Sequence, residues 1–218
     1  MLKEIALVLA GVVVCASTAQ AGELRVLVKD NKSKPVADAV VVAVPLDAKN
    51  ALRGRSPADA VDQVDKQFVP YVKPVFVGAT VRFPNSDNIR HQVYSFSPAK
   101  KFELPLYGGL NAAPVIFDKP GVVILGCNIH DWMIGYIYVS ETPFFAKTGA
   151  AGTAAVADLP PGEYTVRVWH PNLAHAEDTT TRRVTVSAYE ATNAEWQLEL
   201  KSNFRVPRVS GAGSASYP

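Results

Sequence analysis

The chain has 218 residues, of which 48% are hydrophobic and 19% are charged, and its formal net charge at pH 7 is +2. Acidic and basic residues are interspersed without runs of one sign, which argues against a nucleic-acid-binding surface and against a basic membrane-binding helix. This length suits one large domain or two small ones, each with a modest core.

The first 21 residues have the pattern of a secretory signal peptide. A short charged start precedes the apolar run Ile5–Ala16, and residues 19–21 match a small-residue cleavage site. The apolar run is shorter than the ~20 residues that a membrane-spanning helix needs. We therefore expect an exported, periplasmic protein with no membrane span in its mature chain.

Cleavage after residue 21 removes Cys15 and leaves Cys127 as the only thiol. Exported proteins usually pair their cysteines, so a single remaining thiol is buried, joined to another chain or engaged in chemistry. His130 and Met133 follow Cys127 at intervals that let one short loop present all three side chains. Thiolate, imidazole and thioether together favour copper.

Short apolar runs separated by Gly, Pro, Asn and Asp indicate an antiparallel β protein, and helical periodicity is almost absent. The predicted strands are Glu23–Lys29, Ala39–Pro45, Val61–Lys66, Val75–Val77, Thr80–Phe83, His91–Ser95, Val115–Phe117, Val122–Leu125, Ile134–Val139, Glu163–Trp169, Arg183–Ser187 and Ala194–Leu200. We expect an all-β fold with more strands than one small sandwich holds.

Changes in composition divide the mature chain. Residues 46–60 are rich in polar and turn-forming residues and are predicted to be a linker. Residues 61–142 are predicted to form a central β-sandwich. The flanking residues 22–45 and 143–201 are predicted to combine into a second, smaller sandwich. Residues 202–218 lack the apolar content to fold and are predicted to be disordered.

A copper site that changes oxidation state needs two imidazoles, one thiolate and a weak axial thioether. The leading candidate for the second imidazole is His91, which follows the turn-rich residues 84–88 and begins a predicted strand. A zinc site is the alternative, because one Cys and two His also suit zinc, but thioether is a poor zinc ligand. A buried structural thiol is the other interpretation of Cys127.

Two further histidines and one aromatic residue have open interpretations. His170 and His175 are five residues apart in a loop after a strand, and this spacing is a weak indication of a metal pair. We interpret this loop as a turn in which His170 makes a structural hydrogen bond and His175 is solvated. Trp132 is equally compatible with a buried aromatic and with an exposed rim beside His130.

Several motifs between residues 61 and 140 occur in a recognisable order. They are Phe68-x-Pro70, Val75-x-Val77-Gly78-x-Thr80-Val81-x-Phe83-x-Asn85-x-Asp87, His91-x-Val93, Gly121, Cys127-x-x-His130-x-x-Met133 and Gly135-x-Ile137-x-Val139. This order resembles the cupredoxin family, and the ligand loop is most similar to the amicyanin type.

The resemblance implies a Greek-key β-sandwich with one type 1 copper ion. It implies His91, Cys127 and His130 as the strong ligands and Met133 as the axial ligand. Cupredoxins often place an Asn directly after the first ligand histidine, where it braces the ligand loop, whereas this chain has Gln92. The surroundings of the metal are therefore expected to differ from those of the family.

A second resemblance concerns the flanking segments. Glu23–Val28, Pro35–Val40 and Leu159–Val166 resemble carboxypeptidase-regulatory or transthyretin-like sandwiches of the Ig type. Their combination with a plastocyanin-like core is similar to exported proteins described as methylamine-utilisation proteins.

No phosphate-binding loop, activated nucleophile or second copper motif is found in the sequence, so we expect no enzyme activity. The expected function is transport of single electrons between transient redox partner proteins, through the edge of His130. The alternative is copper binding or buffering, or a structural interaction role in an exported assembly.

Overall fold

The computed structural model describes residues 22–47, 59–110 and 112–202. The predicted signal peptide, most of the predicted linker and nearly all of the predicted tail lie outside these residues. The described part is β-sheet and loops with one short 3₁₀ helix, η2 (Glu177–Thr180), which confirms the predicted all-β class. It contains no helix long and apolar enough to cross a membrane.

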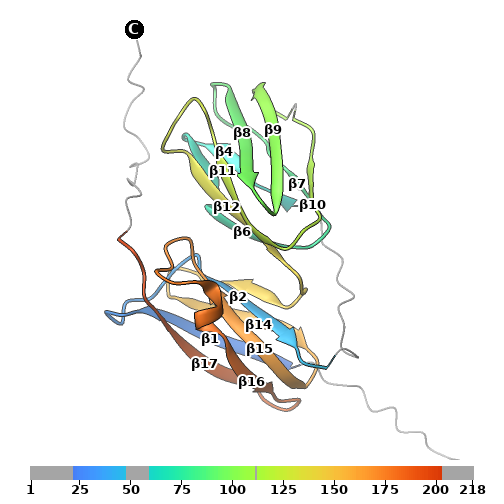
Figure 1. Cartoon of the computed structure of the whole chain (residues 1–218), viewed down its shortest axis with the longest axis vertical. Coiled ribbons are helices and arrows are strands. Elements are labelled where there is room, and N and C mark those ends of the chain that lie inside the picture. The colour runs from blue at the N-terminus through green and yellow to red at the C-terminus, as the bar shows by residue number, and fades with distance from the viewer. Residues whose placement is uncertain (1–21, 48–58, 111, 203–218) are drawn as a thin grey trace, which may run out of the picture.

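Strands from residues 59 to 140 form the first group of sheets (Figure 1). They are β3 (Asp59–Ala60), β4 (Asp62–Val64), β5 (Gln67–Val69), β6 (Val72–Phe76), β7 (Ala79–Arg82), β8 (His91–Ser97), β9 (Lys100–Tyr107), β10 (Val115–Phe117), β11 (Gly121–Gly126) and β12 (Ile134–Ser140). The larger sheet is five-stranded with the order β6-β12-β11-β8-β9, the smaller has the order β10-β7-β3, and β4 pairs with β5.

The remaining strands form a second group. They are β1 (Gly22–Asp30), β2 (Val40–Pro45), β13 (Phe145–Lys147), β14 (Thr153–Leu159), β15 (Gly162–Trp169), β16 (Arg182–Val186) and β17 (Thr192–Leu198). Their two sheets have the orders β14-β1-β17 and β13-β2-β15-β16. Both flanks of the chain therefore contribute to one structure, although the domain boundaries themselves stay a prediction.

Each group encloses its own apolar core. The first core contains Phe68, Phe83 and Phe117 and extends to Cys127 and Met133 at one end of the sandwich. The second core is centred on large buried side chains, which include Trp196, Tyr164 and Leu24. The predicted metal-binding loop thus adjoins a packed interior, which limits the movement of its side chains.

Strand β2 is buried on both faces, because one face belongs to the core of the second group and the other packs against the first group. Val41 and Ala43 belong to the second core, whereas Val40 and Val42 pack with Val72, Tyr138 and Trp169 in a third cluster. Val72 and Tyr138 lie on β6 and β12, so part of the outer face of the five-stranded sheet is covered by the β13-β2-β15-β16 sheet. Figure 1 shows β6 and β12 facing this second group.

An ionic cluster lies at the same contact. The Arg167 guanidinium donates to both carboxylate oxygens of Glu141, at 2.5 and 2.6 Å, and to Glu177 at 2.7 Å. The hydroxyl of Tyr138 also donates to Glu177. Glu141 directly follows β12 and Arg167 lies on β15, so the cluster links the two groups. Its hydrogen bonds are directional, unlike apolar contacts, and therefore restrict how the two groups are oriented.

Several segments differ from the predicted strands; β13, for example, was not predicted, and β6 begins at Val72 and not at Val75. Val61–Lys66 was expected to be one strand, but Asp65 and Lys66 form a turn with φ of 52° and 59°, and β4 and β5 make a hairpin around it. Lys100–Tyr107 forms β9 although it contains Pro105, because an edge strand needs fewer ladder hydrogen bonds. Thr153–Leu159 forms the edge strand β14 despite its small side chains.

The predicted linker also ends earlier than expected. Asp59 and Ala60 form β3 and pair with β7, so the first sandwich begins before residue 61.

Replacing Arg167 with Met tests the contact between the two groups. The substitution leaves the carboxylates of Glu141 and Glu177 without their shared donor, so we expect a loss of about 1 to 3 kcal/mol in the free energy of unfolding. Urea denaturation measures this loss. The matched control is Arg183→Met, because Arg183 is an exposed residue of the neighbouring strand β16. Equal stabilities of the two variants would contradict the role of the cluster.

Alkaline pH tests the burial of Tyr164. Burial raises its pKa from 10.0 to about 12. Since the folded-state pKa lies above the unfolded one, the neutral phenol stabilises the fold below pH 10.0, and this contribution is lost as pH rises to about 12. We expect the pH dependence of the unfolding free energy in this window to be shallower in Tyr164→Phe and unchanged in Tyr189→Phe, whose ring is 94% exposed.

Candidate metal centre

The predicted ligands come together at one end of the five-stranded sheet. His91 begins β8, while the loop of residues 127–133 connects β11 to β12. Strand β8 is the direct neighbour of β11, and Gly126, the last residue of β11, is paired with Tyr94. The pairing of these strands brings an imidazole from a remote part of the sequence next to the loop.

Three of the four predicted ligand residues form a compact group. The ligand atoms of His91, Cys127 and His130 all lie within 4.8 Å of one another. The Cys127 Sγ and the His91 Nδ1 are 3.8 Å apart. Metal bonds of about 2.0 Å to nitrogen and about 2.3 Å to sulfur, at angles near 120°, would place these atoms about 3.8 Å apart. The donor set therefore fits a trigonal metal ion.

Burial shields two of the three residues from water. His91 is fully buried, Cys127 is 3% exposed and His130 is half-buried. The rings of His91 and His130 are 5.0 Å apart between centroids. Cys127 is a free thiol, so no disulfide competes for its sulfur.

Met133 lies beside the group, in the first core. Its side chain is 1% exposed, and it lines the same surface pocket as Cys127. Its backbone N–H donates to the carbonyl of His130 at 2.9 Å, which turns the loop back toward β12. Its role as an axial thioether ligand stays a prediction.

Asp87 orients His91. The Nε2–H of His91 donates to the Asp87 carboxylate at 2.7 Å, so the Nδ1 atom faces Cys127. The same carboxylate accepts the backbone N–H groups of Asp65 and Lys66 in the β4-β5 turn. A carboxylate held at three points fixes both the ring orientation and the tautomer of the imidazole.

Asn85 holds the segment that carries Asp87. Its side-chain amide is 4% exposed and donates to the carbonyls of Ile89 and Tyr107, while its oxygen accepts the N–H of Asp87. Neither Asn85 nor Asp87 was predicted from the sequence to have a role in the site. The available signal was a carboxylate four residues before His91 in a turn-rich segment, but nothing in the sequence shows that its partner is the distant β4-β5 turn.

Gln92 braces the ligand loop. Its side-chain oxygen accepts a hydrogen bond from Asn128 at 2.7 Å, and its nitrogen donates to Glu103 on β9 at 2.5 Å. The residue after the first histidine therefore does contact the ligand loop, although it is Gln and not Asn. The longer side chain also ties the loop to the edge strand.

The surroundings favour ionisation of the Cys127 thiol. Burial by itself raises its pKa, but the hydrogen bond with His91 and the backbone N–H groups of Gln92, Ile129 and His130 lower the pKa below its ordinary value. For His91, burial lowers the pKa, whereas the contacts with Cys127 and Asp87 raise it above its ordinary value. A thiolate held by several donors is suited to bind a metal cation.

The other two histidines take no part in this group. His170 is 9% exposed, and its Nδ1 accepts the N–H of Asn172 within a turn. His175 lies near Glu199, with 3.0 Å between Nε2 and a carboxylate oxygen, and its side chain is 61% exposed. Among the described residues, no second cluster of His, Cys and acidic side chains has metal-binding geometry.

The loop also exposes apolar side chains. Trp132 is 41% exposed and Ile129 is 49% exposed. The Trp132 and His130 rings are 5.1 Å apart between centroids. Trp132 is thus part of the surface next to the half-buried imidazole.

Comparisons with protein-family models and with curated proteins give no match. Among solved structures, a purple cupredoxin from Nitrosopumilus maritimus is 23% identical, with 38% of this chain and 100% of that chain covered and a TM-score of 0.34. An amicyanin variant is 23% identical, with coverage of 46% and 98% and a TM-score of 0.35. A copper-containing nitrite reductase from Thermus scotoductus is 27% identical over 53% of this chain but only 28% of its own, with a TM-score of 0.37.

Removing the Asp87 carboxylate tests the support of His91. We expect Asp87→Ala to weaken copper binding by about 10- to 100-fold, because the imidazole loses the acceptor that fixes its orientation. Asp87→Asn keeps a side-chain oxygen and should retain most of the affinity. Competitive copper titration with a chelator of known affinity measures the difference. In Asp118→Ala, which removes an exposed carboxylate paired with Lys100, affinity should be unchanged.

Proposed function

We propose that the protein is an exported type 1 copper protein that carries single electrons between redox partner proteins. The observation that carries this proposal is the group of two imidazoles and one thiol within 4.8 Å, formed by His91, Cys127 and His130. This donor set, with a nearby thioether from Met133, is typical of copper sites for electron transfer. When bound, copper supplies a one-electron couple.

The surrounding residues keep the donors in place. Asp87 holds His91, Gln92 holds the ligand loop through Asn128, and the core surrounds Cys127. A site held in this way changes little in geometry when its charge changes by one, which favours rapid electron transfer. The half-buried edge of His130, beside exposed Trp132, is the proposed contact for a transient partner, because such encounters use small interfaces.

We propose an electron carrier and not an enzyme, because among the described residues only this one group has metal-binding geometry, and a single copper centre of this type moves electrons. Periplasmic localisation is part of the proposal and is supported by the signal-like pattern of residues 1–21. A relation to methylamine utilisation is supported by sequence resemblance alone.

A second candidate is copper binding or buffering, or a structural role in an exported assembly. The second sandwich favours it, because it is packed on the copper-site sheet through Trp169 and Arg167 and offers a large additional surface. Cyclic voltammetry of the copper-loaded protein and a pull-down from periplasmic extract distinguish the candidates. Rapid, reversible electrochemistry without a stable partner supports the carrier, whereas an inaccessible couple with a stable partner supports the second candidate.

Substitution of Cys127 provides the direct test of the centre. Loading the protein with Cu(II) should give an intense blue, green or purple absorption from thiolate-to-copper charge transfer, and Cys127→Ser should abolish it. Met133→Leu should keep the colour and shift the reduction potential, because only the weak axial ligand is lost. A colourless complex of the unaltered protein would exclude the proposed centre.

A further inference from the structure

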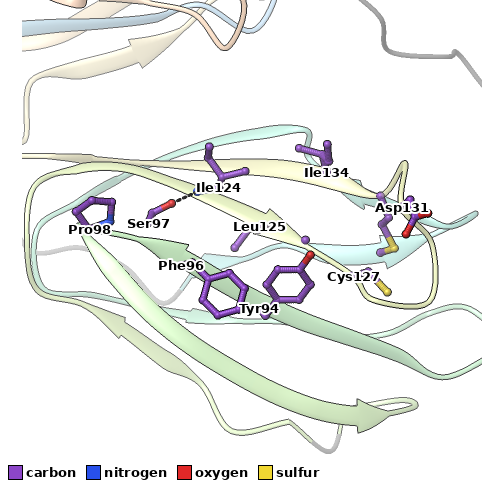
Figure 2. A pocket seen from close by; sticks show the side chains of 11 residues that line it. Tyr94, Phe96, Ser97, Pro98, Ile124, Leu125, Cys127, Asp131 and Ile134 are labelled. Carbon is purple, nitrogen blue, oxygen red and sulfur yellow. Dashed lines mark hydrogen bonds between the residues drawn. The ribbon is translucent and has the colours of Figure 1, made fainter.

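An apolar groove lies on the outer face of the five-stranded sheet and ends at the metal-binding loop. We call it the Phe96 groove; its volume is about 440 Å³, and its walls include Tyr94, Phe96, Pro98, Ile124, Ile134 and Cys127. Figure 2 shows Tyr94 and Phe96 on one side, Ile124 and Ile134 on the other, and Cys127 at one end. The groove therefore leads along the sheet to a proposed copper ligand.

The groove is the part of this sheet face that the second sandwich leaves open. Tyr138 on the same face of β12 is 3% exposed and packs in the contact between the two groups. In the groove, by contrast, Phe96 is 74% exposed, Ile124 49% and Ile134 43%. Large apolar side chains that stay exposed beside a covered face mark a binding surface.

Gly126 shapes the end of the groove next to Cys127. A Cβ atom at this position would lie 2.7 Å from the Tyr94 ring, so only glycine allows the ring to rest directly on the backbone. The Tyr94 and Phe96 rings are 5.2 Å apart between centroids, with a tilt of 44°. They form an aromatic wall that continues to the residue before the thiol.

The size and charge of the groove indicate what it binds. Its volume lies in the range of ~300–1,000 Å³ that is usual for small-molecule sites. Aromatic and aliphatic walls favour a flat, apolar ring. Asp131 is the only acidic or basic residue of the lining, so an anionic ligand is disfavoured, whereas a hydroxyl group can donate a hydrogen bond to the carboxylate.

We propose that the Phe96 groove binds a neutral hydroquinone and passes its electron to the copper centre through the Cys127 sulfur. This inference rests on the proposed function. In each event the hydroquinone loses one electron and one proton and becomes a neutral radical. With copper bound, the electron would reduce Cu(II) to Cu(I), and the proton would pass to water at the open side of the groove. No bond to the protein forms, and a redox partner removes the electron afterwards.

The proposed route differs from partner docking at His130. A ring in the groove would approach Cys127 from the sheet side, whereas Trp132 and His130 lie on the loop surface. Cys127 is both a proposed copper ligand and a residue of the groove lining, so its sulfur would provide a short path for the electron. The protein would thus accept electrons from a small molecule at one surface and deliver them to a protein at another.

Binding is tested first on the metal-free protein, which separates it from copper chemistry. Hydroquinone is titrated without oxygen, and amide chemical shifts are followed by NMR. We expect saturable shifts at Tyr94, Phe96 and Ile124. Phe96→Ala should weaken binding by about tenfold, because it removes the aromatic surface that covers the ligand. Tyr189→Ala, which removes an exposed ring of the second sandwich, should leave binding unchanged.

Electron transfer is tested by stopped-flow reduction of the copper-loaded protein. The rate should saturate with hydroquinone concentration and rise linearly with ascorbate, an anion that reacts without the groove. Ile124→Glu should abolish saturation by hydroquinone and keep the colour and the reduction by ascorbate. The matched control Ile116→Glu changes an isoleucine of β10 that is 54% exposed and should behave like the unaltered protein.

The inference would be overturned if hydroquinone caused no saturable amide chemical-shift changes in the metal-free protein. It would also be overturned if the rate of copper reduction rose linearly with hydroquinone concentration and Ile124→Glu left that rate unchanged. A groove covered by a second copy of the chain would also overturn it and would appear in sedimentation as a dimer that Phe96→Ala dissociates. Failure of both reductants to reduce the copper would refute the proposed electron carrier. The binding measurement on the metal-free protein is independent of that failure.

Discussion

The orientation of the buried His91 imidazole is the constraint on which the candidate centre depends. Its Nε2–H donates to Asp87 and its Nδ1 faces the Cys127 sulfur, so both ring nitrogens have defined directions. The carboxylate in turn accepts the N–H groups of the β4-β5 turn. A fully buried imidazole with this support cannot rotate freely, and the distance to the thiol follows from the pairing of β8 with β11.

The five-stranded sheet has different roles on its two faces. Its inner face builds the core that contains Cys127 and Met133 and holds the ligand loop. Its outer face is shared between the second sandwich, packed over Tyr138, and the Phe96 groove. Because side chains alternate along each strand, Leu125 is fully buried in the core, while its neighbour Ile124 is 49% exposed beside the groove.

Local patterns in the sequence predicted many of the strands, and the strand and turn predictions that failed did so for physical reasons. Ile134–Val139 was predicted almost as observed, because its apolar residues match the period of a strand next to the core. The edge strand β9 was missed, because charges and Pro105 are acceptable only where one side of a strand is unpaired. The turn at Asp65 was missed, because Asp65 and Lys66 adopt its left-handed conformation without the glycine that usually marks such a turn in a sequence.

The sequence by itself determined the all-β class and the donor types of the candidate centre. Both are local properties: alternation extends over a few residues, and Cys127, His130 and Met133 share one loop. Tertiary structure decided which distant groups support that centre and which surface leads to it. Asp87 meets the β4-β5 turn, and the second sandwich covers part of one sheet face, only because strands far apart in sequence pair and pack. Such contacts depend on register and packing between segments, which local composition does not encode.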